Sequence, residues 1–265
     1  MPVTIETSGH VWTIIHNRPD ARNAVDTAHS IALFDAFQAF DADPEARVAV
    51  FYGAGGNFCA GWDLKLAATL QDEAKRTAYF HDIDIERNLR AAMGPSRLAL
   101  SKPVIGAIEG AAVAGGMELA LWCDVRIMAD TAYMGVFCRR WGITLVDGGT
   151  VRLPRIVGQG RALEITMTGR KVPAAECERI GLCEQVVPEG EVRATAEAMA
   201  QNIARFPQDA MRADRAAILA GQSMPVREAL ANEWHRGLDA ISAQGTAGAG
   251  RFSAGAGRSG DFQDI

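Results

Sequence analysis

The chain lacks the features of a nucleic-acid-binding or membrane-spanning protein. Among its 265 residues, 27 Lys and Arg stand against 32 Asp and Glu, and the net charge is −5 with no strongly basic stretch. That balance disfavours binding to nucleic acid. The apolar run 104–114 is interrupted by Glu109 and by glycines, and it is shorter than the roughly 20 residues that a membrane span needs. We therefore expect no nucleic-acid partner and no membrane span.

Cysteine is scarce, and its spacing suits neither a metal site nor a disulfide framework. The five cysteines are odd in number, lie in different segments and form no CxxC pair; they are Cys59, Cys123, Cys138, Cys177 and Cys183. Free buried thiols and no metal site are the expectation. The first twenty residues show no basic segment followed by an apolar one, so no secretory signal is predicted and a reducing cytoplasm fits.

Several catalytic motifs are missing as well. The sequence has no GxSxG, and its five histidines form no cluster. The two glycine bends that follow predicted strands, at 58–64 and 114–118, have neither the GxGxxG spacing nor a GK[ST]. These absences disfavour a serine nucleophile, a dinucleotide-binding turn and a phosphate-binding loop.

The sequence does contain ample material for a folded core, because 48% of its residues are hydrophobic. Short β-branched runs predict an α/β protein that is rich in strands first and helical last. Strands are expected over 11–15, 48–52, 104–108, 125–128 and 133–137, and helices after Asp26, over 162–168, from Pro173 to Gly181, from Val192 and over 225–241. The polar stretch 66–98 is expected to be a loop that leads into a solvent-facing helix. The Gly-, Ala- and Arg-rich tail 245–260 is expected to order only on a partner subunit.

Two glycine-containing bends follow strands and open helices, at 58–64 and 114–118. A bend that enters a helix leaves backbone N–H groups without intrahelical partners, and the helix dipole adds positive potential there. If the bends face each other, two N–H donors converge as in an oxyanion hole. The alternative is that the glycines only permit close packing.

Carboxylates are the best candidates for proton transfer. Glu118 lies in the strongly apolar stretch 113–122, where burial would raise its pKa and suit it to acid–base work; the alternative is a Glu on the exposed side of a helix. Asp147 precedes Gly148 and, taken alone, is more typical of a turn residue or helix N-cap.

Taken together, these segments resemble the crotonase (enoyl-CoA hydratase/isomerase) superfamily over nearly the whole chain. The resemblance rests on five pieces in family order: Asn17-Arg18-Pro19 with Asn23-Ala24; Phe58-Cys59-Ala60-Gly61-Trp62-Asp63-Leu64; Lys102-Pro103-Val104-Ile105-Gly106-Ala107-Ile108 with Gly110, Gly115-Gly116-Met117-Glu118-Leu119-Ala120 and Cys123-Asp124; Gly148-Gly149-Thr150 with Leu153-Pro154 and Gly158; and Thr168-Gly169-Arg170 with 174–181.

The resemblance implies an α/β fold, the crotonase (ClpP-like) spiral of ββα units with a C-terminal helical trimerisation part. Residues 1–190 would form the spiral acyl-CoA-binding core, and 191–265 the helical trimerisation region. A homotrimer or a dimer of trimers is implied.

It also implies an acyl-CoA thioester substrate, with coenzyme A as part of the substrate and no metal or redox cofactor. The thioester oxygen would accept bonds from the backbone N–H groups of Trp62 and Gly115. The residues expected to bind coenzyme A or substrate are Arg22, Ala24, Ala60, Asp63, Leu64, Cys138 and Trp141.

This chain departs from the family pattern at one catalytic position. The hydratases of the family use two glutamates; Glu118 matches the first, but Cys138 stands at the second, in a segment 137–141 unlike that of the hydratases. Asp147 matches by spacing an aspartate of the dienoyl-CoA isomerases, and a related aspartate occurs in naphthoyl-CoA synthases. We therefore expect Glu118 and Asp147 to form the working pair, with Cys138 as a neutral pocket wall rather than a thiolate nucleophile.

The predicted activity is that of an acyl-CoA lyase or isomerase acting on an enoyl-CoA through an enolate. The first expected activity is that of an enoyl-CoA hydratase, and the second is that of a dienoyl- or enoyl-CoA isomerase. The alternatives are an acyl-CoA hydrolase, a member that cleaves a carbon–carbon bond, and a non-catalytic acyl-CoA-binding protein.

Overall fold

The body of the protein is built on two β-sheets, seen in a computed structural model that describes residues 1–258. The larger sheet has the strand order β1-β2-β3-β4-β6-β9. Its strands are β1 (Val3–Ser8), β2 (Val11–His16), β3 (Val48–Gly53), β4 (Val104–Ile108), β6 (Val125–Ala129) and β9 (Gln185–Val187). β1 and β2 are antiparallel, and the other neighbours are parallel. The middle strands are buried apolar runs, as expected for parallel strands covered by helices.

The smaller sheet has the order β5-β7-β8, formed by β5 (Ala111–Val113), β7 (Tyr133–Gly135) and β8 (Val172–Pro173). An isolated bridge joins Cys59 to Ala112, so the segment after β3 runs beside β5. This bridge places the glycine bend at 58–64 beside β5, and β5 leads into the helix that begins at Gly115.

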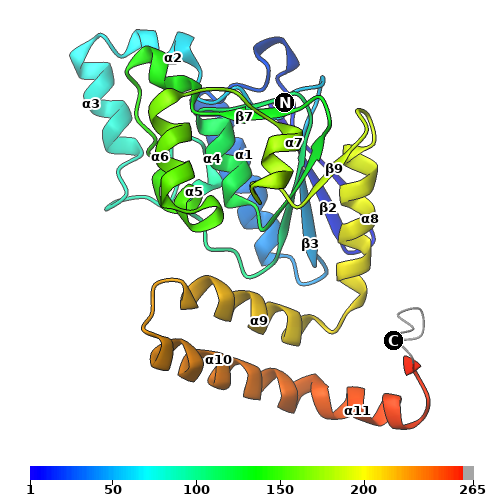
Figure 1. Cartoon of the computed structure of the whole chain (residues 1–265). Coiled ribbons are helices and arrows are strands. Elements are labelled where there is room, and N and C mark those ends of the chain that lie inside the picture. The colour runs from blue at the N-terminus through cyan, green and yellow to red at the C-terminus, as the bar shows by residue number, and fades with distance from the viewer. Residues whose placement is uncertain (259–265) are drawn as a thin grey trace.

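Helices cover both sheets (Figure 1). They are α1 (Thr27–Ala42), α2 (Leu64–Thr69), α3 (Glu73–Asp82), α4 (Gly115–Trp122), α5 (Gly149–Val157), α6 (Gln159–Thr168), α7 (Ala174–Arg179) and α8 (Val192–Arg205), with short 3₁₀ turns at Pro19–Ala21, Pro95–Arg97 and Phe137–Trp141. The Asp26 side chain caps α1 by accepting from the His29 N–H, which confirms the predicted start of that helix. Helix α8 packs against β2, β3, β4 and β6 through its small buried residues.

The C-terminal helices stand apart from this body (Figure 1). They are α9 (Gln208–Gly221), α10 (Val226–Ala240), a π-helical turn (Ile241–Gly245) and α11 (Thr246–Ser253). Within the tail, which is predicted to order on a partner subunit, residues 246–253 form α11, and this helix continues the helical path of α10 through the π turn. Positions 259 and 260 of that expectation lie outside the described residues.

Most predicted elements are confirmed. The stretch 66–98 differs, because its helices α2 and α3 come first and an irregular segment follows them, the reverse of the predicted loop that leads into a helix. The predicted strand 133–137 ends at Gly135, and a 3₁₀ helix begins at Phe137. A Cβ at Gly135 would lie 2.6 Å from the Phe137 ring and 2.7 Å from the Arg170 carbonyl oxygen, so the close neighbours leave room only for glycine. Pro173 ends β8 and caps α7 instead of occupying its first turn. Strand β1 was not predicted, because most of its side chains are polar or exposed.

The five cysteines are free and buried, as predicted. Within residues 1–258, no helix combines the length and the apolar character that crossing a membrane requires. In the same range, no three His, Cys, Asp or Glu side chains are grouped so that they could hold a metal ion.

Candidate active site

The two glycine bends face each other. Gly61 has φ of +95°, and a Cβ on it would lie 2.9 Å from the Ala114 Cβ and 3.0 Å from the Gly115 nitrogen. The bends are tied together by backbone bonds, because the Cys59 N–H donates to the Ala111 carbonyl at 2.9 Å and the Val113 N–H donates to the Cys59 carbonyl at 3.0 Å. Glycine at 61 is therefore required both by its positive φ and by the close approach of the second bend.

Two backbone donors are left unused at this junction. Among the described residues, the N–H groups of Trp62 and Gly115 donate no hydrogen bond. Gly115 is the first residue of α4, where N–H groups have no intrahelical acceptor. Ala114, just before it, has φ of +53° and ψ of −125°, a conformation that a non-glycine residue rarely adopts. The chain thus holds a strained bend at the point where its free donors emerge.

Glu118 lies on α4 one turn beyond these donors and is buried, with 3% exposure, so the alternative of an exposed helix face is wrong. Its Oε1 accepts bonds from the backbone N–H of Asp147 at 2.9 Å and of Gly149 at 2.8 Å. Burial, and next the negative charge of Asp147, raise the pKa of Glu118 to about 7. A carboxyl group with this pKa can both accept and donate a proton near neutral pH.

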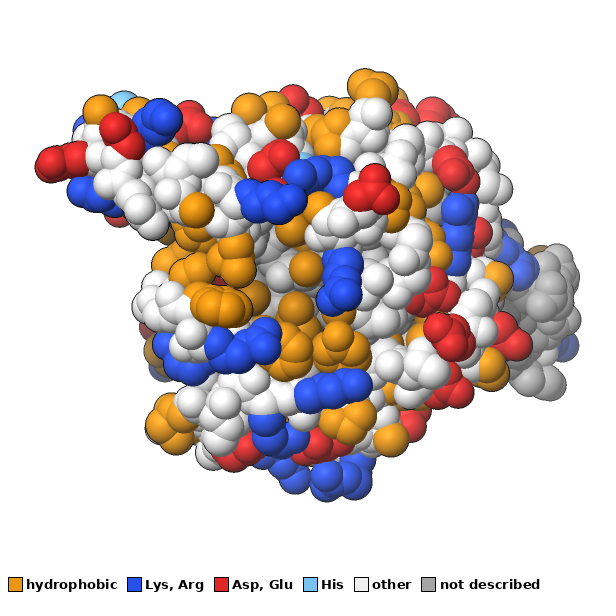
Figure 2. Space-filling view, turned by 90° about the horizontal axis from the view of Figure 1, so that it is seen from above, with side chains coloured by type: hydrophobic (Ala, Val, Ile, Leu, Met, Phe, Trp, Pro, Cys, Tyr) orange, Lys and Arg blue, Asp and Glu red, His pale blue; other side chains and the backbone are white. Residues whose placement is uncertain are grey.

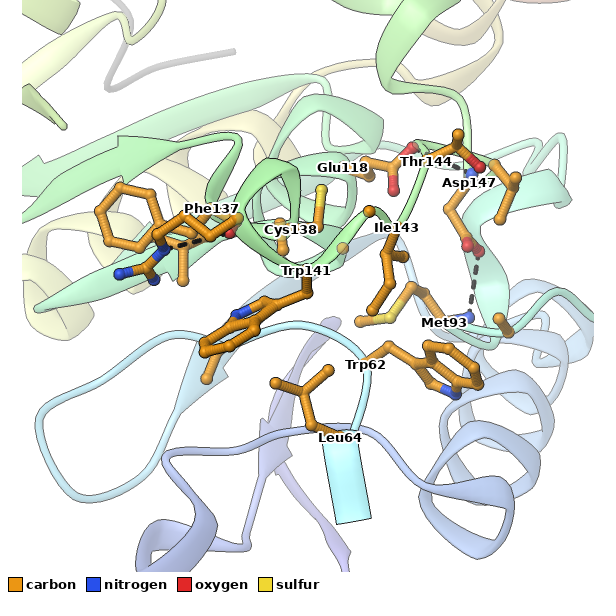
Figure 3. A pocket seen from close by; sticks show the side chains of 18 of the residues that line it. Trp62, Leu64, Met93, Glu118, Phe137, Cys138, Trp141, Ile143, Thr144 and Asp147 are labelled. Carbon is orange, nitrogen blue, oxygen red and sulfur yellow. Dashed lines mark hydrogen bonds between the residues drawn. The ribbon is translucent and has the colours of Figure 1, made fainter. Parts of the chain in front are cut away.

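Asp147 is equally buried and contacts a different segment (Figure 3). Its Oδ1 accepts from the Met93 N–H at 3.0 Å and from the Ser96 hydroxyl at 2.6 Å. Burial raises the pKa of Asp147, and these two hydrogen bonds oppose the rise. Asp147 is not a helix N-cap, because the N-cap position of α5 is occupied by Gly148 and no side chain caps this helix.

A cavity of about 660 Å³ opens in front of Glu118 and Asp147. Aromatic and aliphatic side chains from several elements converge on it (Figure 3), among them Trp62, Leu64, Tyr79, Met93, Phe137, Trp141 and Ile143. Hydrophobic side chains also gather around a hollow on the molecular face shown in Figure 2, with Lys and Arg side chains beside them. An apolar cavity with a few convergent polar groups is the usual form of a small-molecule site.

Cys138 lines this cavity and is buried. Burial, together with the charge of Glu118, raises the pKa of the Cys138 thiol. The group is therefore a neutral thiol at physiological pH, not the thiolate that a nucleophile would need.

The other predicted binding residues divide into two groups. Arg22, Ala60, Leu64 and Trp141 line the cavity together with Cys138. Ala24 and Asp63 lie outside the lining: the Ala24 carbonyl accepts from Arg18 at 2.5 Å, and Asp63 pairs with Arg18 at 3.1 Å while capping α2. In this structure these two residues shape the turn that carries Arg22.

Sequence reasoning missed the segment 92–96 and Tyr79, which complete the cavity and its hydrogen bonds. Met93 and Ser96 lie near the end of the polar stretch 66–98 and carry no motif. Only the fold shows that they lie against Asp147, 51 to 54 residues away along the chain.

Comparison with known proteins agrees with this geometry. The family model described as enoyl-CoA hydratase/isomerase matches residues 6–244. The chain is 34% identical to an enoyl-CoA hydratase of Mycobacterium tuberculosis over 234 residues, which cover 85% of this chain and 83% of that protein. It is 36% identical to the carnitinyl-CoA dehydratase of Salmonella typhi over 229 residues, 83% of this chain and 81% of that protein.

Solved structures show the same fold. The crystal structure of an enoyl-CoA hydratase from Bacillus anthracis superposes with a TM-score of 0.85 at 32% identity, covering 96% of both chains. The spiral α/β fold, the match over residues 6–244 and these relatives together establish that the chain belongs to the enoyl-CoA hydratase/isomerase family of the crotonase superfamily.

Proposed function

We propose that the protein is an acyl-CoA lyase or isomerase that acts on an enoyl-CoA thioester through an enolate, with reversible hydration as its first activity. One observation carries this proposal: a buried carboxyl with a pKa of about 7 faces an apolar cavity, and it lies one helical turn beyond Gly115, whose N–H is one of two unused backbone donors. The relatives support it, since one is named a hydratase and another a dehydratase.

In this mechanism the thioester oxygen accepts bonds from the Trp62 and Gly115 N–H groups. These fixed dipoles stabilise the negative charge that develops on the oxygen as an enolate forms. For hydration, the water oxygen bonds to the β-carbon of the double bond, one water proton passes to Glu118, and Glu118 returns a proton to the α-carbon. The reverse order gives dehydration, and α-proton transfer without water gives isomerisation.

Asp147 is proposed as the second acid–base carboxylate. Its Oδ1 is held by Met93 and Ser96, while Oδ2 accepts no hydrogen bond among the described residues. Cys138, at the position where the family's hydratases have a second glutamate, serves as a wall of the cavity. Isomerisation is the second candidate activity, because an aspartate at 147 combined with a cysteine at 138 departs from the two-glutamate arrangement.

The proposed ligand contacts follow the lining of the cavity. Arg22, Ala60, Leu64 and Trp141 contact the coenzyme A portion or the acyl group of the substrate, and Ala24 and Asp63 support this surface from behind. No further cofactor enters the proposed reaction.

Self-association as a trimer or a dimer of trimers is also proposed. The C-terminal helices expose large apolar side chains, namely Ile218, Leu219, Val226, Leu230, Trp234, Leu238, Ile241 and Phe252. So many exposed apolar side chains on the C-terminal helices are typical of an interaction surface.

The test is a panel of enoyl-CoA thioesters followed by absorbance and mass spectrometry. Hydration removes the conjugated double bond and adds the mass of one water; isomerisation leaves the mass unchanged; hydrolysis releases free coenzyme A. Hydration or isomerisation that is lost in Glu118→Gln supports the proposal. Release of coenzyme A as the sole reaction, or binding without turnover across the panel, would contradict it.

A further inference from the structure

Arg152, on α5, joins two segments that meet at the active site. Its Nη1 donates to the Asp147 carbonyl at 3.0 Å, and its Nη2 donates to the Ser96 carbonyl at 2.7 Å. A further hydrogen bond joins the same two segments, because the Ser96 hydroxyl donates to Asp147 Oδ1 at 2.6 Å. The guanidinium therefore fixes the backbone of the segment that carries Asp147 relative to the segment that carries Met93 and Ser96.

The guanidinium acts from behind the active-site wall. Arg152 is not part of the lining of the reaction cavity, but it lines a second cavity of about 920 Å³. Val146 and Asp147 belong to both linings, so they form the wall between the two cavities. Arg152 thus contacts this wall from the side opposite the substrate.

The contact is close and depends on the bend at Gly148. Gly148 has φ of +101°, and a Cβ there would lie 2.0 Å from Arg152 Nη1. The residues on either side of Gly148 supply the two N–H groups that bind Glu118 Oε1, Asp147 at 2.9 Å and Gly149 at 2.8 Å. Any movement of this bend changes the position of the Glu118 carboxyl group.

We propose that Arg152 is a positioning residue for catalysis: by binding the Ser96 and Asp147 carbonyls together, it holds the 147–149 bend so that Glu118 points at the substrate. This proposal rests on the proposed role of Glu118 as the acid–base group. A planar guanidinium suits the task, because it presents donors on two nitrogens in a fixed fork, whereas a lysine ammonium carries its donors on a single nitrogen.

Arg152 also contributes a positive charge to the site. The titratable and charged groups that influence Glu118 are Asp147, Arg152 and the Cys138 thiol. Burial and Asp147 raise the pKa of Glu118, whereas Arg152 lowers it. Loss of the positive charge therefore moves the Glu118 pKa upward.

The experiment measures kcat, KM and their pH dependence for Arg152→Met, Arg152→Lys and the control Arg155→Met on the thioester that the panel identifies. Arg155 lies on the same helix and lines the same second cavity, but it is exposed and donates only to the Val151 carbonyl of its own helix. We expect Arg152→Met to lose about 10²-fold in kcat with little change in KM. In the pH profile of kcat, the limb that reports Glu118 should move to higher pH by about one unit in this variant.

Arg152→Lys keeps the charge but not the fork, so we expect its pH limb to stay near the wild-type position and its kcat to fall between those of the wild type and Arg152→Met. The control should match the wild type. An unchanged pH limb and kcat in folded Arg152→Met would overturn the proposal, as would full rescue of kcat by Arg152→Lys, which would assign the effect to charge alone. If Glu118→Gln keeps full activity, the proposed function fails instead, whatever the Arg152 variants do.

Discussion

Glu118→Gln should make the protein inactive and more stable at the same time. Glutamine keeps the shape of the side chain, and its Oε1 can still accept from the Asp147 and Gly149 N–H groups. It cannot exchange a proton near neutral pH. We expect kcat to fall on the order of 10²- to 10⁴-fold, the usual contribution of general acid–base catalysis.

The gain in stability follows from the raised pKa of Glu118. Burial and then Asp147 raise that pKa from 4.5 to about 7, so the folded state holds the proton more tightly than the unfolded chain does. Stability is therefore lost as the pH rises from the unfolded to the folded pKa, and the loss is complete above the folded one. Because the unfolded and the folded pKa differ, ionisation of Glu118 lowers the free energy of unfolding by about 3 kcal/mol at pH 8 and by less than about 1 kcal/mol at pH 5.

Glutamine carries no charge and avoids this penalty. Urea or thermal unfolding of the wild type and Glu118→Gln at pH 8 and pH 5 measures it. We expect the variant to be more stable by up to about 3 kcal/mol at pH 8, or roughly 6 °C in melting temperature, with most of the difference gone at pH 5. The exposed Glu86→Gln serves as the control and should change neither activity nor stability.

Two results would refute the reasoning. A variant that keeps wild-type turnover would show that the proton is carried by another group. A variant that is no more stable than the wild type at pH 8 would show that the carboxyl is not held in a costly ionised state, even if activity is lost.

Three further predictions concern the cavity, the glycine bends and the C-terminal helices. Cys138→Ser should keep most activity while Asp147→Asn loses roughly 10²-fold or more, as measured by steady-state kinetics; the reverse pattern, with an acyl group trapped on Cys138 in the mass spectrum, would indicate covalent thioester hydrolysis. Gly61→Ala should lose on the order of 10²-fold in kcat, because its Cβ would press on the Ala114 Cβ at 2.9 Å and the Gly115 nitrogen at 3.0 Å and displace both backbone donors; a folded variant with normal kcat would argue against the paired donors. Light scattering at micromolar concentration should give the mass of a trimer or hexamer, and a monomer would contradict the proposed role of the C-terminal helices.

The sequence predicted the parts of the protein that local pattern determines. β-Branched runs marked the buried strands β2, β3 and β4, and the spacing of small and apolar residues marked α8. The glycine bends and the carboxyl in an apolar stretch were visible because glycine and buried charge are locally costly and stand out from their neighbours. The order of these segments was enough to indicate the family.

Only the tertiary structure decided which groups meet. Residues 93 and 96 reach Asp147, and Arg152 ties the Ser96 and Asp147 backbones together, through contacts between segments more than fifty residues apart. No periodicity records such contacts, because they depend on where two sheets and their helices place each loop. The same holds for the pKa of Glu118: the sequence gives the carboxyl, but burial and the nearby Asp147 charge, which set its pKa, exist only in the folded chain.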